Sequence, residues 1–331
     1  MPEAPGSKAR PADADARREP SSGALQAERL AATFSVVARD PVSGTLGIGV
    51  ASHSFAVASH VPWAEPGTGV VATQAFVAVG EPGSRALALL REGLGAARVL
   101  EHLLAADPAP ALRQIAVVDP DGGVAVHTGA RCIGAASHRA RDGFCVQGNT
   151  LPSETVLDAM AAAYEASRGD LAERLLDALG AGESVGGDLR GRRSAALLVV
   201  PGAPGSAAGS PLVDLRVDDH VDPHAELARL LRIRRAGERF EAAFQSIAGG
   251  EFDAARAHFA DAQKRHPENA EYSFWAGVSL ANAGYVEEGI AWLRQAFAAD
   301  PCWRELIARL PSAGLLVEDA QLSEWIRHGA L

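Results

Sequence analysis

A polar segment just ahead of an apolar run offers side chains that could bind a charged substrate. Its members are Asp188, Arg190, Arg193 and Ser194, and Ser194 opens the run SAALLVVP. A guanidinium can hold a carboxylate through two parallel hydrogen bonds, so this segment predicts a site for a substrate carboxylate. A structural Asp–Arg pair explains the same residues equally well. Thr73 and Gln74 interrupt another apolar run, GTGVVATQAF, and could line the same site.

A group of acids and histidines near residue 220 has side chains of the metal-ligand type. Its members are Asp218, Asp219, His220, Asp222 and His224. Asp222 followed by Pro223 is typical of a helix start, because aspartate caps the first turn and proline suits the first helical position. The chain also has no GxxxxGK[ST], GxGxxG or HExxH motif. We therefore expect neither a metal ion nor a cofactor.

Other reactive side chains are few. His127 alternates with valines in VAVHTG, which is typical of a histidine in a sheet core or edge. Cys132 and Cys145 have no obvious histidine partner in sequence and are expected to be small buried hydrophobic residues. The two lysines, Lys8 and Lys264, both lie outside residues 33–233. A lysine base or Schiff base is therefore excluded from that region.

Composition limits the partners and the compartment. The net charge is −10, and the arginines are interspersed with acids, so nucleic acid is not an expected partner. No apolar run reaches the length of about 18 residues that a membrane span needs, and residues 1–28 lack the apolar core of a signal peptide. Three widely spaced cysteines fit a reducing compartment. The expected location is cytoplasmic, with no membrane partner.

The elements that must position these residues follow from periodicity. Strands are predicted at 33–39, 45–52, 67–76, 113–119, 124–130, 143–149, 194–201 and 213–219, and helices at 82–92, 95–106, 153–167, 171–179 and from 222 onward. Strands and helices come in blocks rather than in βαβ alternation. This order predicts an α+β fold with two antiparallel sheets between helical layers.

Residues 236–301 contain an internal repeat. Its aligned pairs are Gly250 with Gly284, Ala262 with Ala296, and Pro267 with Pro301, each 34 residues apart. This is the tetratricopeptide period, in which each repeat is a pair of helices. The small residues Ala243, Ala255, Gly277 and Gly289 are expected where paired helices approach closely. Two repeats are fewer than the about three usually needed, so we expect 303–310 to cap the array or the array to dock on the first domain.

These residues resemble a known family. The segments TFSVVARDPVSGTLGIGVAS, VPWAEPGTGVVATQA, ALLREGL, HTGARC, VQGN and GDLRGRRSAALLVV occur in this order between residues 33 and 200. They resemble the bacterial N-terminal-nucleophile (Ntn) hydrolase-like family catalogued as domain of unknown function 1028. The resemblance implies a four-layer αββα sandwich and supplies no substrate. The tail, with FWAGVSLANAG, resembles the tetratricopeptide-like or peptidoglycan-binding extension of part of that family.

The resemblance also implies a nucleophile. Ntn hydrolases use an N-terminal Thr, Ser or Cys to attack an amide carbonyl, with the α-amine of the same residue as base. Thr33 stands at that position here. Activity then requires cleavage of Ala32–Thr33 or a true start at residue 33, and a hydroxyl that lies in an open cleft. The alternative is that Thr33 is only a β-branched residue at the start of a strand.

Two residues could assist Thr33. With residues 40–44 as a hairpin loop, Ser52 is its expected polar neighbour, although a shift of one residue would turn Ser52 to the other face. Asn149, at a strand end, could donate its side-chain amide to an oxyanion, or could be a turn asparagine. Proteasome-like relatives carry a lysine near the nucleophile. An acylase-like mechanism that relies on the amine alone is the nearer comparison.

We therefore predict three segments: residues 1–32 as a disordered extension or propeptide, 33–233 as an Ntn-hydrolase-like αββα domain, and 234–331 as a tetratricopeptide-like helical domain. The leading hypothesis is hydrolysis of a small amide or peptide-like substrate that carries a carboxylate. The alternative is a non-catalytic Ntn-like scaffold whose tail binds a protein partner. A homo-oligomer is left open.

Overall fold

Two antiparallel sheets pack face to face in the computed structural model, which describes residues 29–77, 82–203 and 211–329. The first sheet has the order β1 (Arg29–Ala31), β5 (Gly69–Val77), β6 (Arg113–Val118) and β7 (Val124–Thr128), with β4 (Pro62–Glu65) also paired to β5. The second has the order β11 (Val213–Val217), β10 (Ser194–Val200), β3 (Leu46–Ser52), β2 (Thr33–Arg39), β9 (Phe144–Gly148) and β8 (Ser137–Arg141).

Alternation along the strands separates two cores. On β2, Val37 faces the first sheet and joins an apolar layer between the sheets, which includes Ile48 and Val70. Phe34, Val36 and Ala38 of the same strand point the opposite way, into a second core. Successive strand side chains point to opposite faces, so one strand supplies both layers. The β2–β3 hairpin pairs Thr33 with Ser52, which is the predicted register.

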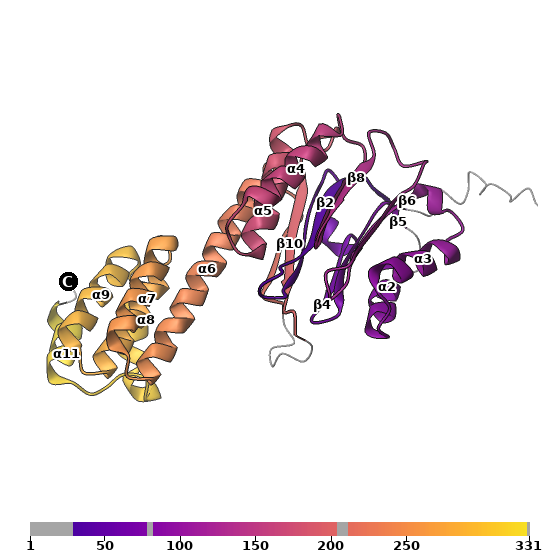
Figure 1. Ribbon diagram of the computed structural model, residues 1–331. Coiled ribbons are helices and arrows are strands. Elements are labelled where there is room, and N and C mark those ends of the chain that lie inside the picture. The colour runs from indigo at the N-terminus through magenta and orange to yellow at the C-terminus, as the bar shows by residue number, and fades with distance from the viewer. Residues whose placement is uncertain (1–28, 78–81, 204–210, 330–331) are drawn as a thin grey trace, which may run out of the picture.

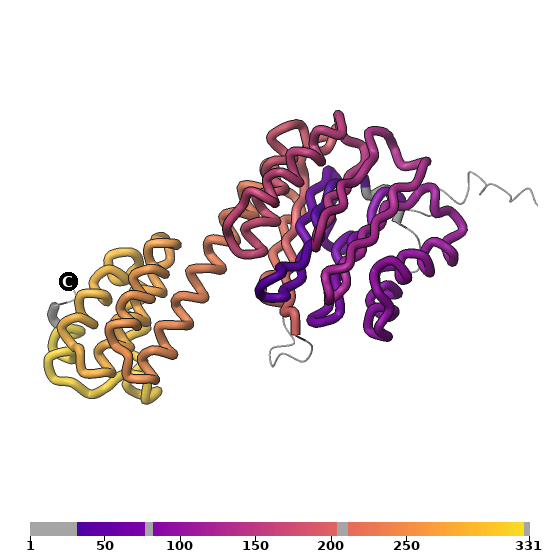
Figure 2. Tube along the Cα trace, viewed as in Figure 1, coloured from indigo at the N-terminus to yellow at the C-terminus, as the bar shows by residue number. Residues whose placement is uncertain are grey.

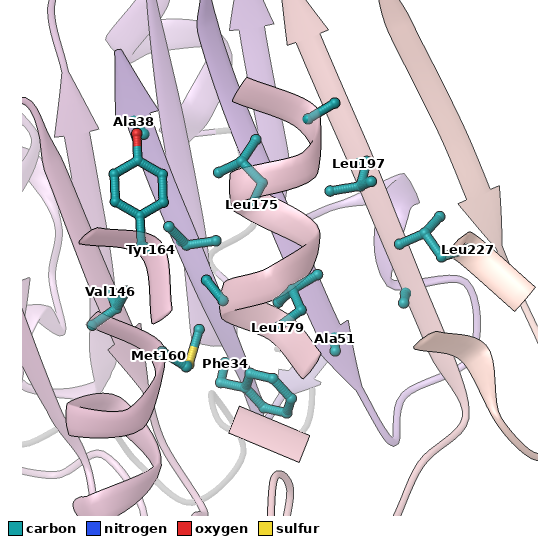
Figure 3. Packing of buried hydrophobic residues seen from close by; sticks show 14 of the residues in the cluster. Phe34, Ala38, Ala51, Val146, Met160, Tyr164, Leu175, Leu179, Leu197 and Leu227 are labelled. Carbon is teal, nitrogen blue, oxygen red and sulfur yellow. The ribbon is translucent and has the colours of Figure 1, made fainter. Parts of the chain in front are cut away.

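Helices cover the outer face of each sheet (Figure 1). The helices α2 (Pro82–Arg91) and α3 (Ala96–Ala106) pack on the first sheet, and α4 (Thr155–Ala166) and α5 (Leu171–Ser184) on the second. Figure 3 shows Met160 of α4 and Leu179 of α5 packing beside Phe34 of β2. An Asp170–Glu173 capping box fixes the start of α5. The predicted α+β organisation with antiparallel sheets and a helical C-terminal part is thus confirmed.

The upstream strand differs from the sequence expectation. Residues 1–28 lie outside the described residues, but Arg29–Ala31, which we expected to be part of a disordered extension, form β1. Three residues carry almost no local strand signal, and β1 exists because its backbone pairs with β5. The short strands β4 and β8 escaped prediction for the same reason.

The C-terminal part consists of helical pairs joined to the sheets by one long helix. The helices are α6 (Pro223–Ala248), α7 (Phe252–Arg265), α8 (Ala270–Asn282), α9 (Val286–Ala299), α10 (Cys302–Arg309) and α11 (Ala320–Glu324). Single turns occur at Val57–Ser59, Pro110–Leu112, Pro311–Ala313 and Trp325–Gly329. Figure 2 shows α6 leaving the sheets and continuing into the helical part, so the expected boundary at 233/234 falls inside one helix. No helix in the described ranges is long and apolar enough to cross a bilayer.

The 34-residue repeat is visible in the helix bounds. Both ends of α7 recur 34 residues later in α9, and Gly250 and Gly284 end α6 and α8 with positive φ angles of 76° and 89°. Between α8 and α9 the backbones nearly touch, because a Cβ on Gly277 would lie 2.7 Å from the carbonyl oxygen of Gly289. The equivalent residues of the first pair, Ala243 and Ala255, are fully buried.

The last helices close the array. Ile307 of α10 and Leu322 of α11 join a cluster with Leu293 and Phe297 of α9. The segment 303–310 therefore covers the second helical pair. This is the first of our two expectations, that these residues cap the array.

The close approach of α8 and α9 makes a stability prediction. Gly277→Ala should lower the free energy of unfolding of the helical part by about 1–3 kcal/mol, because the new methyl group meets backbone that cannot move aside. Gly237→Ala in α6 is the matched control, since nothing lies within 4 Å of its Cβ position, and it should stabilise by about 0.5–1 kcal/mol. Urea denaturation followed by tryptophan fluorescence reports on this part, because every tryptophan except Trp63 lies in it. Equal effects of the two substitutions on the free energy of unfolding would contradict the close approach of α8 and α9.

Candidate functional site

Polar side chains gather at one end of the layer between the sheets. They are Thr33, Ser35, Ser52, Gln74, Gln114, Gln147 and Asn149, and each is no more than 2% exposed. We call them the intersheet polar cluster. Buried polar groups need hydrogen-bond partners, and these residues find most of them in one another.

The carbonyl group before Thr33 is held by two side-chain donors. The Oγ of Ser52 donates to the Ala32 carbonyl oxygen at 2.7 Å, and a terminal nitrogen of Arg190 donates to the same oxygen at 2.6 Å. The Thr33 hydroxyl donates in turn to Ser52 Oγ at 3.2 Å. A hydroxyl therefore lies one residue from a carbonyl whose oxygen accepts a charged and a neutral hydrogen bond.

Asp188 orients Arg190. Its carboxylate is 1% exposed and accepts from Arg190 Nε at 3.0 Å and from a terminal nitrogen at 2.7 Å. The same carboxylate accepts from the backbone N–H of His53 at 3.1 Å, just beyond the end of β3. A bidentate pair of this kind fixes the guanidinium plane. The same terminal nitrogen that bonds to Asp188 is thereby directed at the Ala32 carbonyl.

The carbonyl of Thr33 is held from the other side. Gln74 Nε2 and the backbone N–H of Asn149 both donate to its oxygen at 3.1 Å. Gln114 links these two residues, because its Oε1 accepts from Gln74 Nε2 at 2.8 Å and from Asn149 Nδ2 at 3.0 Å. Its Nε2 reaches Gly148 O at 2.9 Å. Gln114 is thus the centre of the cluster.

Two strained residues border the cluster. Ala75, next to Gln74, has φ 73°, and Thr150, next to Asn149, has φ 56°. Such angles are disfavoured for residues with a Cβ and persist only where the surrounding contacts enforce them. Both strand ends that carry cluster residues are therefore bent into defined positions.

The structure brings together most of the predicted site residues. Thr33, Ser52, Gln74 and Asn149 belong to the cluster. Beside it, Arg190 pairs with Asp188 and donates to the Ala32 carbonyl oxygen. The cluster also contains Ser35, Gln114 and Gln147, which our sequence analysis missed. Their signal was available, since each is a polar residue in an otherwise apolar strand.

Two predicted substrate residues lie elsewhere. Thr73 is on the opposite face of β5 from Gln74, and its hydroxyl bonds to His60 O and Trp63 Nε1. Ser194 is fully buried and holds a loop, donating to Ser54 O at 2.6 Å and accepting from Val57 N. Neither contacts Thr33, because alternation and loop anchoring direct both hydroxyls away from it. Arg193 also points away and pairs with Asp219 at 2.8 Å.

Thr33 does not lie in an open cleft in this chain. Its side chain is fully buried, and the upstream residues continue into β1 on the first sheet. The expectation of an accessible hydroxyl is therefore wrong for the intact chain. Pairing between β1 and β5 is the cause, because it carries the chain across the end of the cluster.

The cysteines and the acidic and histidine residues near residue 220 were the other candidates for chemistry. Burial raises the pKa of the Cys145 thiol to about 12, and burial also raises the pKa of the Cys132 thiol. Thiols in such surroundings are poor nucleophiles. Asp222 caps α6 by accepting from Ala225 N, and no group of three or more potential metal ligands occurs among the described residues.

Comparison with known proteins gives a family match that covers strands β2–β11 and the helices α2–α5 on the two sheets. The family DUF1028, described as a family of unknown function, matches residues 33–227, a range that starts at the threonine and ends within α6. The crystal structure of a DUF1028 protein from Silicibacter pomeroyi is similar at 32% sequence identity with a TM-score of 0.55. That similarity covers 61% of this chain and 85% of the other. No curated protein matches.

The position of Gln114 generates a prediction. Gln114→Leu should lower the free energy of unfolding by about 2–3 kcal/mol, because it removes the partner of several buried polar groups at once. Gln245→Leu, on an exposed position of α6, is the matched control and should change stability by less than about 0.5 kcal/mol. Urea denaturation followed by far-UV circular dichroism measures both. A Gln114 variant as stable as the control would show that the cluster is not tightly coupled.

Proposed function

The chain belongs to the DUF1028 family, and on that premise we propose that a form beginning at Thr33 is an Ntn-type hydrolase of small amide or peptide-like substrates. The nucleophile is the Thr33 hydroxyl, and the base is the α-amine of the same residue. The order of layers, helices on each outer face of two stacked sheets, supports the Ntn assignment. The 34-residue helical pairs support the tetratricopeptide-like assignment of the tail.

One observation carries the proposal: the clamp on the Ala32 carbonyl. Arg190 and Ser52 donate to an oxygen that lies directly beside the proposed nucleophile. Donors fixed around a carbonyl oxygen stabilise the negative charge that develops when the carbonyl carbon is attacked. Of the predicted residues, Ser52 and Arg190 therefore serve as oxyanion donors, while Asn149 holds the Thr33 backbone. From the sequence we expected either a substrate carboxylate or a structural Asp–Arg pair, and Arg190 here pairs with Asp188 and contacts a backbone carbonyl.

The reaction needs no group beyond these residues and water. The Thr33 hydroxyl attacks the carbonyl carbon of the amide and passes its proton to the free α-amine. The C–N bond breaks, the leaving nitrogen takes that proton, and an ester to Thr33 remains. Water then attacks the ester, and the amine accepts one proton from it. The amine passes this proton to the Thr33 oxygen as the C–O bond breaks, and the carboxylic acid product leaves. One amide and one water give one acid and one amine.

The first test is activity of a chain that starts at residue 33. A form with Thr33 exposed after removal of an initiator methionine should hydrolyse members of an amide panel, whereas the full-length chain, whose threonine is sealed, should not. Thr33→Ala in the shortened form should reduce turnover to background. A folded form beginning at Thr33 that cleaves nothing would favour the alternative, a scaffold whose helical repeats bind a protein partner.

The oxyanion role of Arg190 has a matched control. In the shortened form, Arg190→Gln should lower kcat about 10²- to 10³-fold, the cost of losing one oxyanion donor. Arg193→Gln removes the same charge three residues away. It breaks an exposed pair with Asp219 and a contact with the exposed Phe55 ring, neither of which reaches Thr33, so kcat should be unchanged. Circular dichroism checks that both variants fold. Equal kcat values for the two variants would remove Arg190 from the reaction.

The identity of the base sets the pH profile. An α-amine has a pKa of about 7.7–8.0 and acts as a base only when unprotonated. The value of kcat/KM should therefore rise about tenfold per pH unit below this range and level off above about pH 8. A profile that falls as pH rises from 6 to 8 would exclude the amine as base.

A further inference from the structure

We infer that β1 and Ala32 occupy the acyl-binding site of the proposed hydrolase, so that its substrates are extended peptide-like chains with a small residue at the reacting carbonyl. This inference rests on the proposed function and names its substrate class. The upstream segment then acts as an internal substrate mimic that keeps the site closed.

The first support is the way β1 pairs. It runs antiparallel to β5, with Leu30 opposite Phe76 and Ala31 opposite Ala75. The opposite edge of β5 pairs with β6 over residues 70–75, and β4 pairs with residues 69–72. Among the described residues, Phe76 and Val77 of β5 pair with β1 alone. An extended peptide could form the same backbone hydrogen bonds, which is the usual way a sheet edge binds a peptide.

The second support is that contacts from outside β1 also hold this part of β5. At Ala75, with φ 73°, β5 leaves β6 and turns toward β1. Arg113 fixes the turned segment, since its NH1 donates to Phe76 O at 2.8 Å. The pair of Arg113 with Asp107, at 2.7 Å and almost fully buried, holds the guanidinium in place. The edge is therefore arranged in advance for a strand partner.

The third support is the end of the segment. The strand leads directly to Ala32, whose carbonyl oxygen lies in the clamp formed by Arg190 and Ser52. The Ala32 side chain is fully buried, which favours a residue no larger than alanine beside the reacting carbonyl. After hydrolysis, the product carboxylate would form at this point, where a guanidinium is a suitable partner.

The test uses the full chain and measures binding without any turnover. Ala32→Leu should expel β1, because the larger side chain does not fit, and the amides of residues 75–77 should then exchange with solvent at least tenfold faster. Adding the peptide LQAERLAA, the sequence of residues 25–32, should restore their protection and give a saturable calorimetric signal. The peptide LQAERLAL should bind about tenfold more weakly or worse. Ala260→Leu, on the exposed face of α7, is the control and should change nothing at residues 75–77.

The outcomes separate the two proposals. If residues 75–77 stay protected in Ala32→Leu, or are released but bind neither peptide, the acyl-site assignment is wrong. If LQAERLAA binds while the form beginning at Thr33 hydrolyses no amide, the peptide site stands and the hydrolase proposal fails. Should Ala32→Leu not fold, Arg190→Gln in the full chain replaces it. That variant should speed exchange at residues 75–77 several-fold, Arg193→Gln should not, and equal exchange in both would overturn the inference.

Discussion

Polar side chains buried between two sheets must find hydrogen-bond partners there, and the structure around Thr33 follows from this constraint. An unpaired polar group in such a place costs about 1–3 kcal/mol, so each member of the intersheet polar cluster fixes the position of the next. Gln114 is central because its amide serves as acceptor and donor together, joining β5, β6 and β9. The Thr33 backbone is held by the same bonds that satisfy Gln74 and Asn149. The bonds that satisfy Gln74, Gln114 and Asn149 therefore also fix the position of the threonine backbone.

The charged residues beside the cluster also need partners, because burying an unpaired charge costs more free energy than burying an unpaired neutral group. Asp188 is 1% exposed, and a carboxylate so buried requires a charged partner and further donors. Arg190 and the His53 backbone supply them, and the terminal nitrogen of Arg190 that bonds to Asp188 also donates to the Ala32 carbonyl. The upstream strand and the charged loop are therefore linked. The burial of Thr33 and the donors on the Ala32 carbonyl therefore depend on the same set of bonds.

The helical part obeys a different rule. Its pairs are held by small residues that let backbones approach, as at Gly277 and Gly289, and by an apolar cluster that α10 and α11 complete. The continuous helix α6 connects the helical part to the second sheet. An ion pair between Arg235 of α6 and Asp170, the residue that caps α5, stabilises this connection. Because α6 packs both on the second sheet and on α7, movement of the helical part would act on the sheet through one rigid element.

The sequence by itself determined the order of the longer strands and of the helices that cover the sheets, the β2–β3 register that pairs Thr33 with Ser52, and the 34-residue helical repeat. These depend on local periodicity and turn residues, which neighbours along the chain specify. Only the tertiary structure decided that Arg29–Ala31 form a strand, that Gln114 is the centre of the cluster, and that Thr73 and Ser194 point away from Thr33. Those outcomes depend on which strands become neighbours in space, and on which face of a strand meets the opposite sheet. Such pairings join residues far apart in the chain, and local sequence carries no record of them.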